Sequence, residues 1–220
     1  MLYTMRLSLP DKPGMLGSVA TSISHVPASI VTLRVVEHDG DHAVDELVVK
    51  AEGASPEALR DAAQAIPGVV VECVRRVQSE PDPLAGLLLA DRLGRGIGPP
   101  TQSLVDGLPD ALPAAWAIAF DVQDELTLVA ASADAPVPGM LETPWLPLDC
   151  ARRLHFGEWM PQRWRMARFE LAAVPFGSPT CFVVVGRWPG MRFRPTELRQ
   201  MDILASMALR APRASYEAAV

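Results

Sequence analysis

The chain has 220 residues, a length that suits one large domain or two small ones. Its formal net charge is −6, which argues against a protein that coats nucleic acid or an anionic membrane surface. No stretch approaches the roughly 18 apolar residues of a membrane span, and no signal peptide is recognisable, so we expect a cytoplasmic protein. The three cysteines form no CxxC pair and predict neither a disulfide framework nor a zinc site. The preference for arginine over lysine suggests a bacterial genome rich in G and C.

Strand and helix patterns alternate from the N-terminus onward. Apolar residues alternate over 5–9, which predicts a strand, and recur at helical spacing over 16–23. Residues 29–38 are rich in β-branched side chains and predict a second strand. The dipeptide Asp39-Gly40 then predicts a tight hairpin turn into a third strand at 44–50.

A second helix and a fourth strand follow. Ser55 is the expected N-cap of the helix, which ends before Pro67-Gly68, and residues 69–77 read as a strand. The order βαββαβ predicts a ferredoxin-like fold, in which an antiparallel sheet carries two helices on one face. We expect this domain to span 1–77.

Residues 78–83, the sequence QSEPDP, are typical of a linker and separate the first domain from a second at 84–213. The second domain reads as α+β with an antiparallel sheet. Its expected helices are at 84–93, 103–107, 148–156 and 195–210, and its expected strands at 116–121, 126–131, 167–174 and 181–188.

The first strand–helix junction carries the most informative motif, which is Asp11, Lys12, Pro13, Gly14, Met15 and Leu16. At this point of a βαββαβ unit, Asp-Lys-Pro-Gly-x-Leu resembles the ACT domain, a family of small regulatory modules that commonly bind amino acids. The resemblance covers about residues 3–77. It implies an effector pocket beside this loop, usually at an interface between two ACT domains, and therefore a homodimer.

The physical chemistry of the loop is compatible with that site. Gly14 lets the backbone approach a ligand, and the N–H groups of Met15, Leu16 and Gly17 can meet a carboxylate. Asp11 can accept a hydrogen bond from an ammonium group. The same residues also fit a second interpretation, in which Asp11 caps the helix or the turn and Pro13-Gly14 only makes a tight turn.

Many amino-acid-binding ACT domains carry a small-Gly-x-Asn-Ile turn before the second strand. The matching stretch here is Pro27-Ala28-Ser29-Ile30, and we expect Ser29 and Ile30 to belong to the ligand site. Ser29 stands in the place of the asparagine and cannot supply the donors and acceptor of an amide. This departure favours the alternative of an ACT module that dimerises without a ligand.

The last part of the second half resembles the end of a GAF domain. The resemblance rests on Val174-Pro175-Phe176, Gly186-Arg187 and the segment 193–198, and it covers about residues 84–211. It implies a sensor module, since GAF domains bind cyclic nucleotides, tetrapyrroles or small metabolites, or only dimerise. Neither Cys150 nor Cys181 lies in a recognisable tetrapyrrole-attachment setting.

Two other clusters combine side chains that could bind a ligand. His38 and His42 with nearby aspartates make a metal site conceivable, but hairpin tips are commonly polar, and we expect neither a metal nor a cofactor. The segment 152–168 concentrates arginines with Trp159 and Trp164. We expect it to be a solvated, partly packed surface, with an anionic ligand in the GAF-like cleft as the alternative and no nucleic-acid partner.

These observations together predict a regulatory protein. The sequence lacks the GxSxG and HExxH motifs, and we expect no enzymatic activity, an ACT-regulated enzyme being the weaker alternative. A small effector, most plausibly an amino acid, would bind near 11–16 and bias the pairing of two copies. No output domain is recognisable, so the expected signal passes to a separate partner protein.

Overall fold

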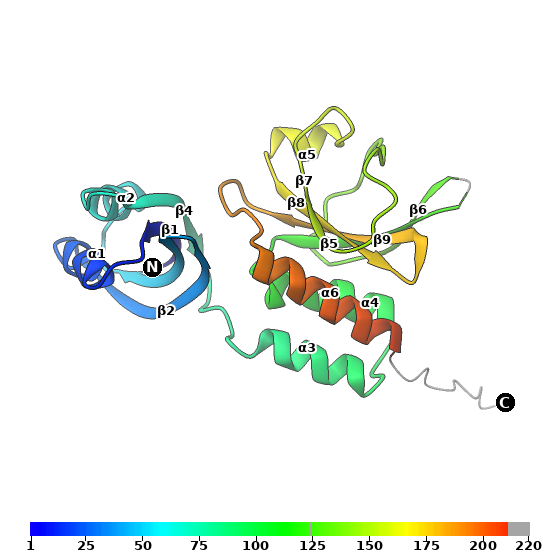
Figure 1. Cartoon of the computed structure of the whole chain (residues 1–220), viewed down its shortest axis with the longest axis horizontal. Helices are drawn as coiled ribbons and strands as arrows, with labels where there is room; N and C mark the ends of the chain where they lie inside the picture. Colours follow the sequence, from blue (N-terminus) through cyan, green and yellow to red (C-terminus); the bar gives the residue numbers. More distant parts are fainter. Residues whose placement is uncertain (124, 211–220) are drawn as a thin grey trace. The chain divides into compact units, whose positions relative to one another are not determined.

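The computed structural model describes residues 1–123 and 125–210. The chain divides into two compact units, Met1–Glu80 and a second unit that begins at Pro81 (Figure 1). The expected linker, 78–83, spans this division. The last residues of the expected second domain, 211–213, lie outside the described residues.

The first unit has a ferredoxin-like topology. Its strand order is β2-β3-β1-β4 with every neighbouring pair antiparallel, which confirms the predicted βαββαβ arrangement. Its elements are β1 (Leu2–Pro10), α1 (Met15–Ile23), β2 (Ala28–Asp39), β3 (His42–Ala51), α2 (Pro56–Gln64) and β4 (Val70–Val77).

Local sequence signals account for these elements. Asp39 pairs with His42 across a two-residue turn in which Gly40 has φ +65°, as the Asp-Gly dipeptide predicted. Ser55 caps α2 by accepting a hydrogen bond from the Ala58 N–H at 3.1 Å. The two helices cover one face of the sheet (Figure 1), where they bury apolar side chains that alternate along β1 and β3.

The second unit is built around a five-stranded antiparallel sheet of order β6-β5-β9-β8-β7. Helices α3, α4 and α6 lie on one face, whereas α5 and the long connection before it lie on the other (Figure 1). Its elements are α3 (Ala85–Gly94), α4 (Pro100–Ala111), β5 (Trp116–Val122), β6 (Leu126–Ala131), β7 (Arg152–Leu154), α5 (Gln162–Met166), β8 (Glu170–Phe176), β9 (Ser178–Arg187) and α6 (Pro195–Arg210).

The prediction of a helix at 148–156 is wrong. That segment is a loop followed by β7, which pairs with β8 from Arg152 opposite Ala173 to Leu154 opposite Leu171. Leu148, Ala151 and Leu154 recur every third residue, and that spacing imitated a helical stripe. All three are buried without a helix because the segment covers the sheet and supplies its edge strand.

Two further helices differ from expectation. Helix α4 extends from Pro100 to Ala111, beyond the predicted 103–107 at both ends. It starts earlier because Pro100 occupies the first turn, where the missing N–H of proline is not needed, and it continues past Gly107 with Pro109 inside it. Helix α5 was not predicted, since five residues are too few to show a period. Every helix in the described ranges is too short or too polar to cross a lipid bilayer.

A buried ion pair joins β9 to the start of α6. The two guanidinium Nη atoms of Arg187 donate to the carboxylate of Glu197 at 2.8 and 2.7 Å, and both side chains are buried. The same carboxylate accepts from the Arg194 N–H at 2.9 Å, which serves the start of the helix in place of a Ser or Thr cap. Arg187 also lies 4.1 Å above the centre of the Phe193 ring.

Replacing Glu197 with alanine should therefore destabilise the second unit strongly. The substitution leaves a buried guanidinium without its bidentate partner, and breaking such a pair costs about 3–5 kcal/mol. All five tryptophans of the chain lie in the second unit, so urea unfolding followed by tryptophan fluorescence reports on this unit. The control is Asp91→Ala, which removes an exposed pair with Arg95 and should cost less than about 1 kcal/mol. Equal losses in the two variants would contradict the structural role of Glu197.

Candidate functional site

The Asp11–Leu16 loop lies at the end of β1, beside the β2–β3 hairpin. The Asp11 N–H donates to the Asp41 carbonyl oxygen at 2.8 Å, and the Asp11 carboxylate lies 3.1 Å from Nδ1 of His38. Both side chains are more than half exposed. Helix α1 has no side-chain cap, so the interpretation of Asp11 as its N-cap is wrong.

The start of α1 keeps backbone donors available. Gly14 has φ +89°, a conformation that side chains rarely adopt, and a Cβ there would meet nothing within 4 Å. The Met15 N–H already donates to the Lys12 carbonyl oxygen at 3.2 Å, which removes it from the expected set of donors. Among the described residues, the Leu16 and Gly17 N–H groups have no acceptor, and Leu16 is exposed.

Ser29 and Ile30 lie far from this loop within one chain. They begin β2 and pair with Lys50 and Val49, whereas the loop lies next to the other end of β2, at His38. With a rise of about 3.3 Å per residue, the two ends are on the order of 30 Å apart. One chain therefore does not bring the predicted ligand-site residues together.

A carboxylate that the sequence analysis did not select lies close to the loop. Asp45 is only 3% exposed, and its Oδ1 atom has no hydrogen-bond partner among the described residues. In the sheet it stands between Leu7 and Val35, on the face that α1 and α2 cover. Burial raises the pKa of Asp45; the charge of His38 opposes that rise and the charge of Asp11 adds to it. Only the alternation along β3 could have pointed to this residue, since it places Asp45 in phase with Leu47 and Val49.

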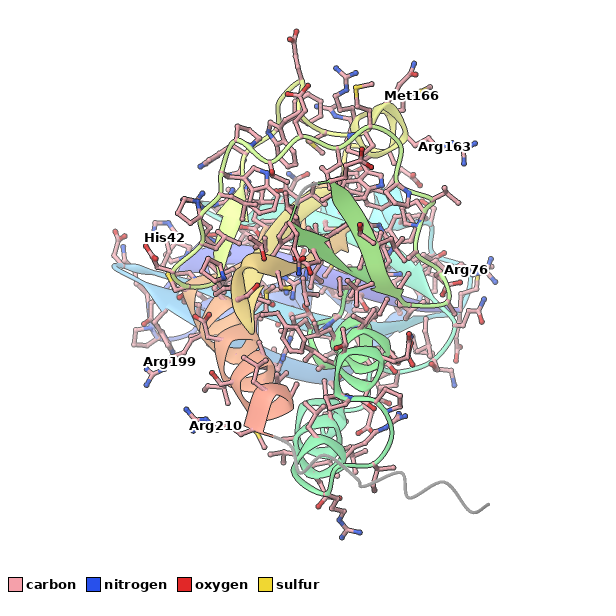
Figure 2. The ribbon with its side chains drawn as sticks, turned by 90° about the vertical axis from the view of Figure 1, so that its right-hand side faces the viewer. His42, Arg76, Arg163, Met166, Arg199 and Arg210 are labelled. Carbon is pink, nitrogen blue, oxygen red and sulfur yellow. The ribbon has the colours of Figure 1, made fainter. Side chains whose placement is uncertain are left out.

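The hairpin tip does not assemble a metal site among the described residues, where no three metal-ligating side chains come together. His42 lies at the surface of the hairpin (Figure 2) with its Nδ1 2.8 Å from Asp41. This hydrogen bond lowers the pKa of Asp41. His38 instead faces Asp11.

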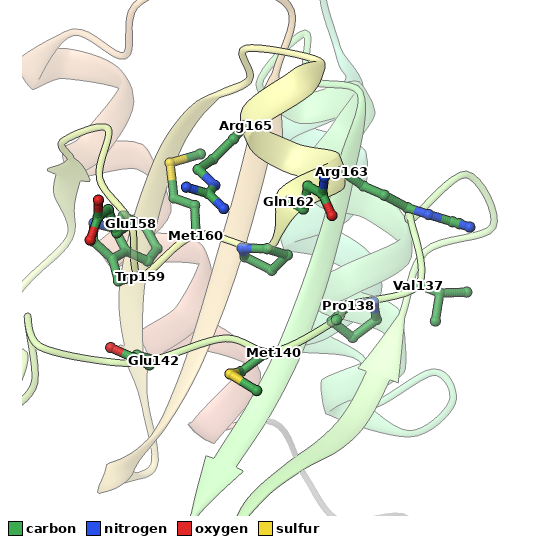
Figure 3. A pocket seen from close by; sticks show the side chains of 12 residues that line it. Val137, Pro138, Met140, Glu142, Glu158, Trp159, Met160, Gln162, Arg163 and Arg165 are labelled. Atoms are coloured by element: carbon green, nitrogen blue, oxygen red, sulfur yellow. The ribbon is translucent and has the colours of Figure 1, made fainter.

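The second unit has a groove of about 610 Å³ between the connection at 137–142 and the start of α5 (Figure 3). The Glu142 N–H donates to the Trp159 carbonyl oxygen at 3.1 Å and holds the two walls together. Charges of both signs line it, namely Glu142, Glu158, Arg163 and Arg165. This balance favours a small molecule of mixed polarity over a polyanion.

The arginine and tryptophan cluster of 152–168 is divided by the structure. Trp164 is fully buried in the core, where its ring centre lies 4.7 Å from that of Trp116. Both arginines line the groove, but Arg165 points toward Met160, whereas Arg163 extends away from Met160 (Figures 2 and 3). Arg152 donates to the Trp145 carbonyl oxygen. Trp164 thus belongs to the packed part of the segment, and Arg163 and Arg165 point in different directions (Figure 3).

No family model matches the chain, and no curated protein matches it. Among solved structures, the GAF domain of a phosphoenolpyruvate-protein phosphotransferase from Coxiella burnetii is 15% identical, with a TM-score of 0.40, over 56% of this chain and 88% of that one. The ACT domain of a GTP pyrophosphokinase from Chlorobium tepidum is 22% identical, with a TM-score of 0.28, over 37% and 91%. The chromophore-binding domain of a bacteriophytochrome from R. palustris is 10% identical, with a TM-score of 0.42, over 95% and 92%.

Replacing Asp45 with asparagine should stabilise the first unit at neutral pH. Because its pKa is raised on folding, the folded state binds more protons than the unfolded state just above the ordinary pKa of aspartate, and stability falls as pH rises through that range. Asparagine removes this penalty, so we expect a gain on the order of 1 kcal/mol at pH 7 that shrinks toward pH 4. Amide hydrogen exchange of β1 and β3 measures it, because the first unit contains no tryptophan.

Asp41→Asn is the matched control for this pH series. Its carboxylate is fully exposed and its pKa is lowered by the hydrogen bond to His42, so its removal should give no gain at pH 7. A loss of protection in Asp45→Asn at pH 7 would contradict the assignment of Asp45 as an uncompensated buried charge.

Proposed function

We propose that this protein is a small-molecule-sensing regulatory protein whose effector is an amino acid. The amino acid binds at the Asp11–Leu16 loop, beside the end of β2 that carries His38. The groups beside this end of β2 support the proposal. An exposed carboxylate, a glycine turn and two available backbone N–H groups at a helix start lie beside the terminal strand of a sheet. A helix start attracts a carboxylate and Asp11 attracts an ammonium group, so the pair suits a zwitterion.

The proposal includes a homodimer formed through β2. Strand β2 is an edge strand of the sheet. It carries an alternating apolar row, Val31, Leu33 and Val35, and each of these residues is between 38% and 46% exposed. A long terminal strand with an apolar row is suited to pairing with another strand, and homo-oligomers are commonly two-fold symmetric. Antiparallel pairing about an axis at Leu33 places the partner's Val35 beside Val31.

Such pairing also explains the separation of the predicted site residues. Because the two copies of β2 would run in opposite directions, the partner's Ser29 and the partner's Ile30 move toward the Asp11 loop of this chain. The ligand site is then shared between two copies. An effector bound there stabilises the pair only by the difference in its affinity for the paired and unpaired states.

The second unit has the role of a second sensing or transmitting module in this proposal. Its groove at Glu142 and Arg165 is large enough for a small molecule, and its mixed charges suit a metabolite. We propose that the protein is not an enzyme and that a separate partner carries the output. The alternative, a dimerisation module without a ligand, is favoured by the apolar row on β2 and is separated by the experiments below.

We expect one or a few amino acids to raise the melting temperature of the full chain. In calorimetry of the protein against the twenty amino acids and common nucleotides, a ligand that binds only the folded state adds about 2.7 kcal/mol of stability at a hundredfold excess over its Kd. Asp11→Ala should abolish the shift because it removes the acceptor for the ammonium group. Asp41→Ala, which removes a neighbouring exposed carboxylate, should keep it. A dimer that shows no shift with any compound would favour the ligand-free module.

We expect Leu33→Lys to convert the dimer into a monomer. The substitution places two ammonium groups together at the two-fold axis and removes apolar contact area. Sedimentation velocity over a concentration series measures the change. The matched control is Val70→Lys, an exposed valine on β4 at the opposite edge of the same sheet, which should leave the dimer intact. A dimer that persists in Leu33→Lys and dissociates in Val70→Lys would place the interface on the other edge.

A further inference from the structure

Two acidic residues, adjacent on β3, differ sharply in their surroundings. Glu46 receives a hydrogen bond from the Arg6 guanidinium at 2.8 Å and lies 3.3 Å from Arg34, so its charge is compensated. Asp45, on the other face of the same strand, has an unpaired Oδ1 although it is almost fully buried. A buried polar atom without a partner is costly, and it commonly marks a place where another group binds.

Asp45 forms no ion pair with a described residue, and only the charge of His38 opposes the rise of its pKa. Helix α1, which covers this face, contains no charged side chain, and the strand neighbours of Asp45 are Leu7 and Val35. The charged groups that act on it are His38 and Asp11, which already pair with one another. The local field is therefore that of two carboxylates and one histidine.

Exposed side chains adjoin the buried Asp45. Val35 directly opposite it on β2 is 46% exposed, and the side chains of His38 and Asp11 are 63% and 52% exposed. His38 pairs with Ala43, two residues from Asp45, so it stands on the same face of the sheet. The exposed side chain of His38 can change rotamer without a movement of the backbone.

We infer that Asp45, together with Asp11, binds the protonated amino group of the effector and thereby restricts the ligand to compounds with a free primary ammonium group. The inference rests on the proposed function and adds the residue that selects the ligand. The ammonium group supplies the missing hydrogen bonds to Asp45, and the carboxylate of the same ligand reaches the Leu16 and Gly17 N–H groups. A bound divalent metal is less suited, because three ligating side chains do not meet in the described part of the chain.

The test compares the full-length protein with Asp45→Asn and Asp41→Asn by calorimetry. The probes are the twenty L-amino acids, their N-acetyl derivatives, and zinc and magnesium chloride. We expect an amino acid to raise the melting temperature of the natural protein and of Asp41→Asn, and its N-acetyl derivative to have no effect. In Asp45→Asn, the affinity for the amino acid should fall about tenfold or more, as expected for loss of a hydrogen bond to a charged group. Asp45→Asn should nevertheless fold, because it removes a buried charge.

The outcomes separate this inference from the proposed function. An amino-acid shift that Asp11→Ala abolishes and Asp45→Asn retains overturns the role of Asp45 and leaves the sensing function in place. A shift given equally by the N-acetyl derivative, or by a metal salt alone, overturns ammonium recognition. A natural protein that responds to no amino acid overturns both the function and the inference.

Discussion

The alternation of side chains along β3 is the constraint on which the candidate site depends. Leu47 and Val49 must face the helices to form the core, and the same alternation turns Asp45 toward that face two residues away. A shift of the register by one residue would expose both apolar side chains, so the strand cannot move to relieve the carboxylate. The hairpin at Asp39-Gly40 fixes this register, because Asp39 and His42 pair directly across it. Uncompensated charge near the loop is thus built into the fold.

The ferredoxin-like half was readable from the sequence because its signals are local. The Asp-Gly turn, the Ser55 cap and the β-branched run before the hairpin each act within a few residues, and together they allow only a few topologies. Helix α6 was similarly clear from its apolar stripe. The segment around β7 was not, because its fold is decided by the free edge of β8 rather than by its own pattern. Leu148, Ala151 and Leu154 are buried because their segment packs over the sheet, so their burial does not require a helix.

The candidate site was less readable than the fold for a related reason. Proline and glycine mark the loop at Asp11 in the sequence, and its position beside the hairpin follows from the strand order. No local sequence signal marks Asp45 as a buried residue. An aspartate near a hairpin tip is ordinary, and its burial depends on strands and a helix that are distant in sequence. The opposite positions of Ser29 and Asp11 likewise emerge only when β2 is seen to be long and to run past the whole sheet.

A site divided between two copies has a consequence for signalling. If the ligand contacts Asp11 and Asp45 of one copy and the partner's Ser29, its affinity is higher for the pair than for the single chain, and binding must then favour pairing by the same factor. A hundredfold difference in affinity moves the pairing equilibrium by about 2.7 kcal/mol, which is enough to exchange a minor state for a major one. The buried charge on Asp45 increases the effect, because a ligand that compensates it removes a penalty present only in the folded, unliganded protein. Sensing would then depend on the uncompensated buried carboxylate of Asp45, and a variant that is more stable at this position would lose the ligand response.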